Sequence, residues 1–295
     1  MQTFTECLPC FERQIEKLAA MVAADDRKLQ ERIQQQCQEI IRQTDTNHPP
    51  PELAARIYAQ AAKLTGQNDF FAQHKHKANT QVLELLPSLE ERIQASPDPL
   101  LTSLRFSLIA NYIDVGVDGE FDWEAALTQE KAQEEVGGYS KLCQLLHTDR
   151  PQVMILGDNA GEIGMDTLLV KQLQGLEAEV TYVVRGAPIL NDATLEDARF
   201  VGMDRICRVI SSGVDGPGTL LSRCHPEFLE KLYTAPIVIS KGQGNFESLH
   251  GRLAGIFFAL KVKCPVVAEL TGFPVRTSVF DQMMPEEHEA PSPET

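Results

Sequence analysis

QVMILGDNAGEIGMD, at residues 152–166, joins an apolar run to a polar turn that contains glycine. The run VMIL is typical of a buried strand, and a helical spacing of apolar residues begins at Gly164. A strand that leads through a short turn into a helix is the first half of a βαβ unit and favours a parallel sheet. The turn carries an acid, an amide and a glycine, so it also marks a candidate site.

The same alternation continues through the second half of the chain. Short β-branched runs are each followed by turn or polar residues, and helical patterns at 164–175 and 246–260 lie between them. This order predicts an α/β core over residues 151–283, with a mostly parallel sheet covered by helices on both faces. The predicted strands are 152–158, 179–186, 205–211, 236–242 and 264–270.

The first half of the chain is helical in character. Residues 11–24, for example, place Ile15, Leu18 and Val22 on one helix face. We expect a helical N-terminal region over residues 1–150, which either folds alone or packs against the sheet as an extension of it. The acidic, proline-rich residues 284–295 are predicted to be disordered. The predicted helices are 11–24, 28–43, 48–66, 74–89, 98–116 and 123–133.

Composition limits the classes of partner. The 27 basic and 42 acidic residues give a formal net charge of −15, which disfavours nucleic acid and anionic membranes as partners. An anionic ligand would therefore need a local source of positive charge, such as a metal ion, a few basic side chains or a helix N-terminus. The start lacks the apolar core of a signal peptide, and no apolar run is long enough to cross a membrane. Seven cysteines in such a chain favour reduced thiols and a cytoplasmic location.

Polar residues gather where the first two predicted strands end. Asp158 and Asn159 offer two neighbouring oxygens suited to a hard cation, or one of them caps the following helix. Gly161 would let the backbone approach a ligand closely. After the second strand, Arg185 could meet a phosphate bidentately, and Asp192 either reaches the same cation or caps its own helix. Ligands of open parallel sheets bind outside the carboxyl ends of the strands, so these residues define one candidate site.

The segment KGQGNFESL follows the fourth predicted strand. Lys241, Gly242, Gly244 and Asn245 resemble an anion cradle, although a glycine-rich turn with a surface lysine explains them equally well. The segment matches neither the Walker loop nor the dinucleotide fingerprint. Carboxylate, amide, cation and free N–H groups at one sheet edge together favour a metal ion plus a phosphate.

These segments resemble the signature segments of the DUF89 family, also called the damage-control phosphatase or ARMT1-like family. The resemblance spans roughly residues 5–275 and also includes NYIDVGVDGEFD, SSGVDGPGT and LKVKCPVVA. It implies a Rossmann-like α/β/α sandwich and one divalent metal ion, Mg, Mn, Co or Ni. By the same resemblance, Asp158, Asn159 and Asp192 would hold the metal, and Lys241 would lie near the phosphate. The residues that would line the substrate pocket with Arg185 are Gly161, Glu162, Gly242, Gly244 and Asn245.

Two further pairs of residues have open roles. Cys7 and Cys10, in CLPC, resemble the Cys-x-x-Cys of the prokaryotic-type subgroup. They would bind a soft metal, cycle as a disulfide or simply face the core. Asn111 and Asp114 either reach the site from the helical region or lie on a solvated helix face.

The function that these observations favour is metal-dependent hydrolysis of small phosphate monoesters, such as sugar phosphates or damaged phosphometabolites. Either a water molecule or the Asp158 carboxylate would be the nucleophile. Two alternatives are an S-adenosylmethionine-dependent carboxyl methyltransferase and a non-catalytic phosphometabolite-binding protein. A methyltransferase needs an acidic contact to ribose after its second strand, where this chain has Arg185.

Overall fold

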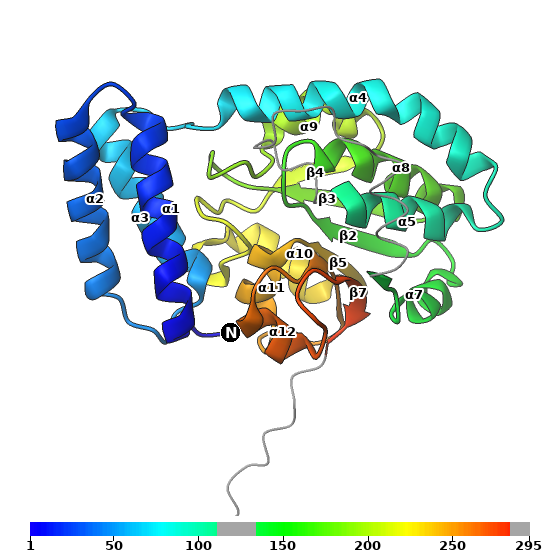
Figure 1. Ribbon diagram of the computed structural model, residues 1–295. Coiled ribbons are helices and arrows are strands. Elements are labelled where there is room, and N and C mark those ends of the chain that lie inside the picture. The colour runs from blue at the N-terminus through cyan, green and yellow to red at the C-terminus, as the bar shows by residue number, and fades with distance from the viewer. Residues whose placement is uncertain (111–133, 284–295) are drawn as a thin grey trace, which may run out of the picture.

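The computed structural model describes residues 1–110 and 134–283. A seven-stranded sheet forms its centre, with the spatial order β1-β7-β6-β5-β2-β3-β4 (Figure 1). The five strands β2 to β6 run parallel, whereas β7 is antiparallel to β6. The strands are β1 (Glu134–Glu135), β2 (Gln152–Leu156), β3 (Glu179–Val184), β4 (Arg208–Ser211), β5 (Ile237–Lys241), β6 (Ile256–Lys261) and β7 (Ser278–Gln282).

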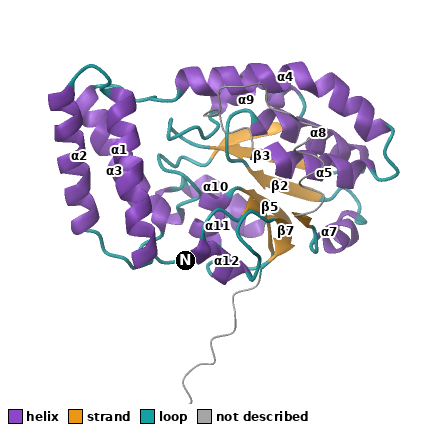
Figure 2. Cartoon of the chain, viewed as in Figure 1, coloured by secondary structure: helices purple, strands orange, loops and turns teal. Residues whose placement is uncertain are grey.

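Helices cover both faces of this sheet, as expected for an α/β/α sandwich (Figure 2). The alternation of side chains along a strand shows why: Val153 and Ile155 of β2 join one apolar cluster, and Met154 and Leu156 join the other. The first cluster includes α5 (Pro99–Ile109), α7 (Tyr139–Leu146), α8 (Glu162–Gly175) and α9 (Leu195–Val201). The second includes α10 (Pro226–Thr234), α11 (Gln243–Leu249) and α12 (Pro265–Thr271).

The helical region divides into two parts with different packing. Helices α1 (Leu8–Val22), α2 (Arg27–Arg42) and α3 (Pro50–Thr65) share their own apolar cluster beside the sheet (Figure 1). The long helix α4 (Ala72–Gln94) packs instead with α5 and α8. Helices α5 and α7 thus pack on the sheet, and α4 packs on the helices that cover it.

One part of the predicted sheet is wrong. Residues 256–260, predicted as the end of a helix, form β6, and residues 264–270, predicted as a strand, form most of α12. Short apolar runs do not by themselves distinguish a buried strand from a buried helix. Cys264 with Pro265 at the first helical position starts α12, and Gly255, at φ +77°, separates β6 from the preceding turn. The strands β7 and β1 were not predicted.

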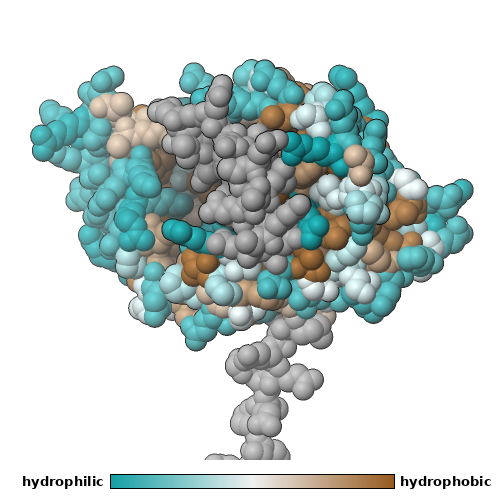
Figure 3. Space-filling view, turned by 45° about the vertical axis from the view of Figure 1, so that its right-hand side comes forward, coloured by the Kyte–Doolittle hydropathy of each residue, from teal (hydrophilic) through white to brown (hydrophobic). Residues whose placement is uncertain are grey.

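The visible surface is mainly hydrophilic, as expected for a chain with many charged residues. In the view of Figure 3, hydrophilic side chains dominate the visible described surface and apolar ones form scattered areas. Of the described helices, none is both long and apolar enough to cross a membrane. The predicted helix at 123–133 and the predicted tail at 284–295 lie outside the described residues.

Candidate active site

The candidate site lies at the point where the strand order reverses. From β2 the chain proceeds to β3 on one side, whereas β5 pairs with β2 on the other. The loops after β2 and β5 therefore diverge and leave a crevice at the carboxyl edge of the sheet. They carry Asp158 and Gly242, which lie against each other: a Cβ added at Gly242 would overlap the Asp158 carboxylate.

Hydrogen bonds between two loops bring the predicted metal ligands together. Asn159 and Asp192 form an isolated antiparallel bridge between the β2–α8 loop and the β3–α9 loop. The Ala160 N–H donates to Asn191 O at 2.8 Å, and the Ala193 N–H donates to Asp158 O at 2.7 Å. Asp158 and Asn159 are thus held beside Asp192, which follows more than thirty residues later in the chain.

Arg185 connects the two acids of this group. Its Nε lies 2.6 Å from Asp192 Oδ2, and its Nη2 lies 3.4 Å from Asp158 Oδ1. All three side chains are buried, with at most 8% of each residue exposed. Burial raises the pKa of Asp158 to about 7, and the negative charge of Asp192 adds to the rise. Burial also raises the pKa of Asp192. The positive charges of Arg185, Lys263 and Lys241 lower the pKa of Asp158, but they do not offset its burial and the negative charge of Asp192.

The amide of Asn159 is oriented by two carboxylates. Its Nδ2 donates to Asp158 Oδ2 at 3.1 Å and to Glu162 Oε2 at 3.5 Å. Among the described residues, none donates a hydrogen bond to its Oδ1. With respect to the described residues, Asn159 thus offers an oxygen without a donor beside two buried carboxylates, and hard divalent cations prefer such oxygen ligands. The donor set fits a divalent ion.

Glu162 also belongs to a buried ion cluster beneath the crevice. Lys241 Nζ lies 2.5 Å from Glu162 Oε1 and 2.8 Å from Asp166 Oδ1, and it donates to Ser107 Oγ at 2.7 Å. Tyr182 donates to the other Asp166 oxygen at 2.6 Å. Burial raises the pKa of Glu162 to about 7 against the opposing charge of Lys241. Burial alone would lower the pKa of Lys241, but Asp166 and Glu162 raise it above its usual value.

Known proteins were compared with this chain. The damage-control phosphatase ARMT1-like domain matches residues 3–279. The chain belongs to this family. A damage-control phosphatase from Archaeoglobus fulgidus is 32% identical over 86% of this chain and 90% of that protein. An uncharacterised protein from Methanocaldococcus jannaschii is also 32% identical, over 93% of each chain. The crystal structure of a DUF89 family protein from Pyrococcus horikoshii superposes with a TM-score of 0.83, at 26% identity, over 96% of this chain and 99% of that one.

Other candidate residues of this ARMT1-like chain support the backbone of the site. Asn245 donates to Gly157 O at 3.1 Å and to Lys241 O at 2.7 Å, so it ties the end of β2 to the end of β5. Gly244 packs against Gly218, where a Cβ would overlap the Gly244 carbonyl. That Asn245 and Gly244 contact the substrate stays a prediction. The same holds for Arg185 and Lys241.

The structure leaves the roles of the four remaining candidates open. Cys7 is half-buried and Cys10 is exposed, and both are free thiols. Within the described part of the chain, no three His, Cys, Asp or Glu side chains are arranged to hold a metal ion. The roles considered for these cysteines stay open. Asn111 and Asp114 lie outside the described residues.

The structure adds two residues that the sequence analysis did not assign to the site. Lys263 is exposed just after β6 at the same sheet edge, and its charge lowers the pKa of Asp158. Had 256–260 been recognised as a strand, Lys263 would have been identified as a candidate, because ligands bind at the carboxyl ends of parallel strands. Asn79, on α4, accepts a hydrogen bond from the Gly161 N–H at 2.6 Å and donates to Asp197 at 3.0 Å. The N–H of Gly161, a residue predicted to line the substrate pocket, is thereby hydrogen-bonded within the protein.

Gly242→Ala should lower kcat/KM at least about a hundredfold, a loss on the order of that for removing one preorganised catalytic group. The added Cβ would displace the Asp158 carboxylate, and φ at Gly242 is +79°. Gly66→Ala is the matched control, because Gly66 has φ +72° with no heavy atom within 4 Å of the added Cβ. Steady-state kinetics and thermal melts of both variants separate the loss of activity caused by the contact with Asp158 from the loss of stability caused by the positive φ. Equal activity in the two variants would show that the contact with Asp158 is unimportant.

Proposed function

We propose that the protein hydrolyses small phosphate monoesters with the help of one divalent metal ion held by Asp158, Asn159 and Asp192. The observation that carries this proposal is the bridge between Asn159 and Asp192, which joins the two loops that carry the buried acids Asp158 and Asp192. The relatives named damage-control phosphatases, from Archaeoglobus fulgidus and Pyrococcus horikoshii, support the reaction class. Mg, Mn, Co and Ni are the candidate ions.

The bound ion would supply Lewis-acid neutralisation of a phosphoryl oxygen. The protein's own groups do the remaining positioning. Arg185 holds the carboxylates of Asp158 and Asp192 in fixed directions. Glu162, paired with Lys241, accepts a hydrogen bond from the Asn159 amide nitrogen and so helps to orient that amide. We assign to the exposed ammonium of Lys263 the role of binding a non-bridging phosphate oxygen.

The nucleophile is either a water molecule or the Asp158 carboxylate. Attack by Asp158 would form an acyl phosphate and release the alcohol, and water would then regenerate the carboxylate. Rapid acid quenching during turnover, followed by reduction with borohydride and peptide mass spectrometry, distinguishes the two routes. Conversion of Asp158 to homoserine would identify the carboxylate as the nucleophile, and recovery of unmodified Asp158 throughout the steady state would favour water.

Turnover of an aryl phosphate tests the proposed reaction. The purified protein, stripped of metal by a chelator, should be inactive and should regain activity with Mn, Co or Ni at about one equivalent. A methyltransferase or a non-catalytic binding protein would give no turnover with any of these ions. Activity that persists after complete removal of metal would contradict the proposed role of the ion.

A further inference from the structure

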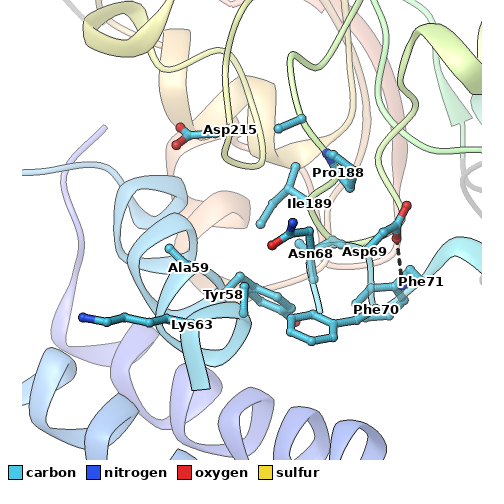
Figure 4. A pocket seen from close by; sticks show the side chains of 13 residues that line it. Tyr58, Ala59, Lys63, Asn68, Asp69, Phe70, Phe71, Pro188, Ile189 and Asp215 are labelled. Atoms are coloured by element: carbon cyan, nitrogen blue, oxygen red, sulfur yellow. Dashed lines mark hydrogen bonds between the residues drawn. The ribbon is translucent and has the colours of Figure 1, made fainter. Parts of the chain in front are cut away.

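A cavity of about 520 Å³ opens between helix α3 and the loop that follows β3 (Figure 4). Its walls are mainly apolar. Tyr58 of α3 lies with Phe70 and Phe71, from the α3–α4 connection, across from Pro188 and Ile189 of the β3–α9 loop. The rings of Tyr58 and Phe71 are tilted by 46° with centroids 6.4 Å apart.

The acids in these walls already have partners. Asp69 pairs with Lys75 at 3.0 Å, and Asp215 pairs with Arg223 at 2.7 Å. The amide of Asn68 extends into the space between the two walls and makes no side-chain hydrogen bond to the described residues (Figure 4). The interior therefore presents apolar surface and one uncommitted amide, with no unpaired carboxylate.

Lys63 also lines the rim of the cavity. Its side chain points away from the aromatic rings (Figure 4). The Lys63 ammonium group therefore faces solvent, and the walls of the cavity stay apolar.

The cavity is joined to the candidate metal site by a short piece of chain. The Asp192 N–H donates to Ile189 O at 3.1 Å, so a wall residue and a candidate metal ligand are fixed to each other. The charge of Asp192 also contributes, after burial, to the raised pKa of Tyr58. The cavity therefore lies beside the loop that carries Asp192.

We propose that this cavity binds the organic part of the substrate and selects esters in which that part carries a planar, mostly apolar ring. This inference rests on the proposed phosphatase function. The volume falls in the range of roughly 300–1,000 Å³ that accommodates molecules larger than a simple sugar. Aromatic walls favour a stacked or edge-on ring, whereas a polyol would place hydroxyl groups against apolar surface without partners.

The test uses pairs of ligands that differ only in a phenyl ring. The two esters are 2-phenylethyl phosphate and ethyl phosphate, and the two non-hydrolysable analogues are 3-phenylpropylphosphonate and propylphosphonate. Ala59→Phe fills the cavity from the exposed face of α3, where Ala59 lines it. Ala20→Phe, at an exposed position of α1, is the matched control.

The wild type and Ala20→Phe should prefer the phenyl-bearing ester in kcat/KM, and the phenyl-bearing phosphonate in calorimetric affinity. Ala59→Phe should lower both preferences by about tenfold, a factor at the lower end of those for one misfitted apolar group. Unchanged preferences in Ala59→Phe, or equal affinities of the wild type for both phosphonates, would overturn the inference and leave the phosphatase proposal intact. Selective phosphonate binding without turnover of either ester would support the cavity and refute the phosphatase.

Discussion

Asp192→Asn should lower kcat/KM for phosphate esters by roughly a hundred- to a thousandfold, as for loss of one preorganised charged group. Asparagine keeps the volume and can still accept the hydrogen bond from Arg185 Nε, which is 2.6 Å long in the wild type. What it removes is one of the two negative charges that face the proposed cation. We therefore expect the loss to arise mainly from weaker metal binding.

Kinetics at increasing Mn concentration, together with a calorimetric Mn titration, measure the effect of Asp192→Asn. Asp204→Asn, at an exposed position outside the candidate site, controls for a change of net charge by one unit. Full activity and unchanged Mn affinity in Asp192→Asn would remove Asp192 from the site. A variant that binds Mn normally but fails to turn over substrate would assign Asp192 to a step after metal binding.

Lys241→Met should lower the free energy of unfolding by about 3–5 kcal/mol, the usual cost of breaking a buried ion pair from one side. Lys241 is fully buried, and its removal leaves Glu162 and Asp166, both also fully buried, without a cation. The exposed Lys17→Met is the control and should unfold like the wild type. Urea unfolding followed by circular dichroism gives the difference.

A companion variant separates stability from catalysis at Lys241. Combining Lys241→Met with Glu162→Gln and Asp166→Asn removes all three charges and should recover much of the lost stability. If this triple variant folds well yet lacks activity, the cluster positions the site, most directly through the contact of Glu162 with Asn159. A Lys241→Met variant with wild-type stability would show that its ammonium is not the structural partner of the two acids.

The sequence was sufficient to predict the convergence of Asp158, Asn159 and Asp192. The reason is general: polar residues after parallel strands meet at one edge, whichever helices cover the sheet. Strands β2, β3 and β5 were each predicted to within a few residues, because β-branched runs and following turns mark them clearly.

Burial of the polar residues was beyond the sequence analysis. The predicted proximity of Lys241 and Arg185 to a phosphate stays a prediction, but their contacts with two carboxylates each inside the protein were not foreseen. The partners of Lys241 lie one turn apart on α8, at positions 162 and 166. Their spacing shows that they share a helix face, but it does not show that this face is buried. Local spacing fixes which residues share a helix face, whereas tertiary packing decides what that face meets.

The exchanged assignments at 256–260 and 264–270 had a direct functional consequence. With β6 taken as helix, the strand-end rule was not applied after Lys261, and Lys263 was not considered. Both segments are short and apolar, and the sheet distinguishes them most directly: β6 is hydrogen-bonded between β5 and β7, whereas 264–270 belongs to no strand. The order of the strands in a sheet depends on the whole fold and is not contained in the sequence of one short segment.

The central claim is that oxygens from two separate loops converge on a single divalent cation. Crystals soaked in Mn and measured for anomalous scattering test it directly. We predict one strong peak within about 2.0–2.6 Å of oxygen atoms of Asp158, Asn159 and Asp192, the range for protein oxygens around hard divalent ions. A protein that hydrolyses phosphate esters with Mn, but whose only anomalous peak lies away from these three side chains, would contradict the account.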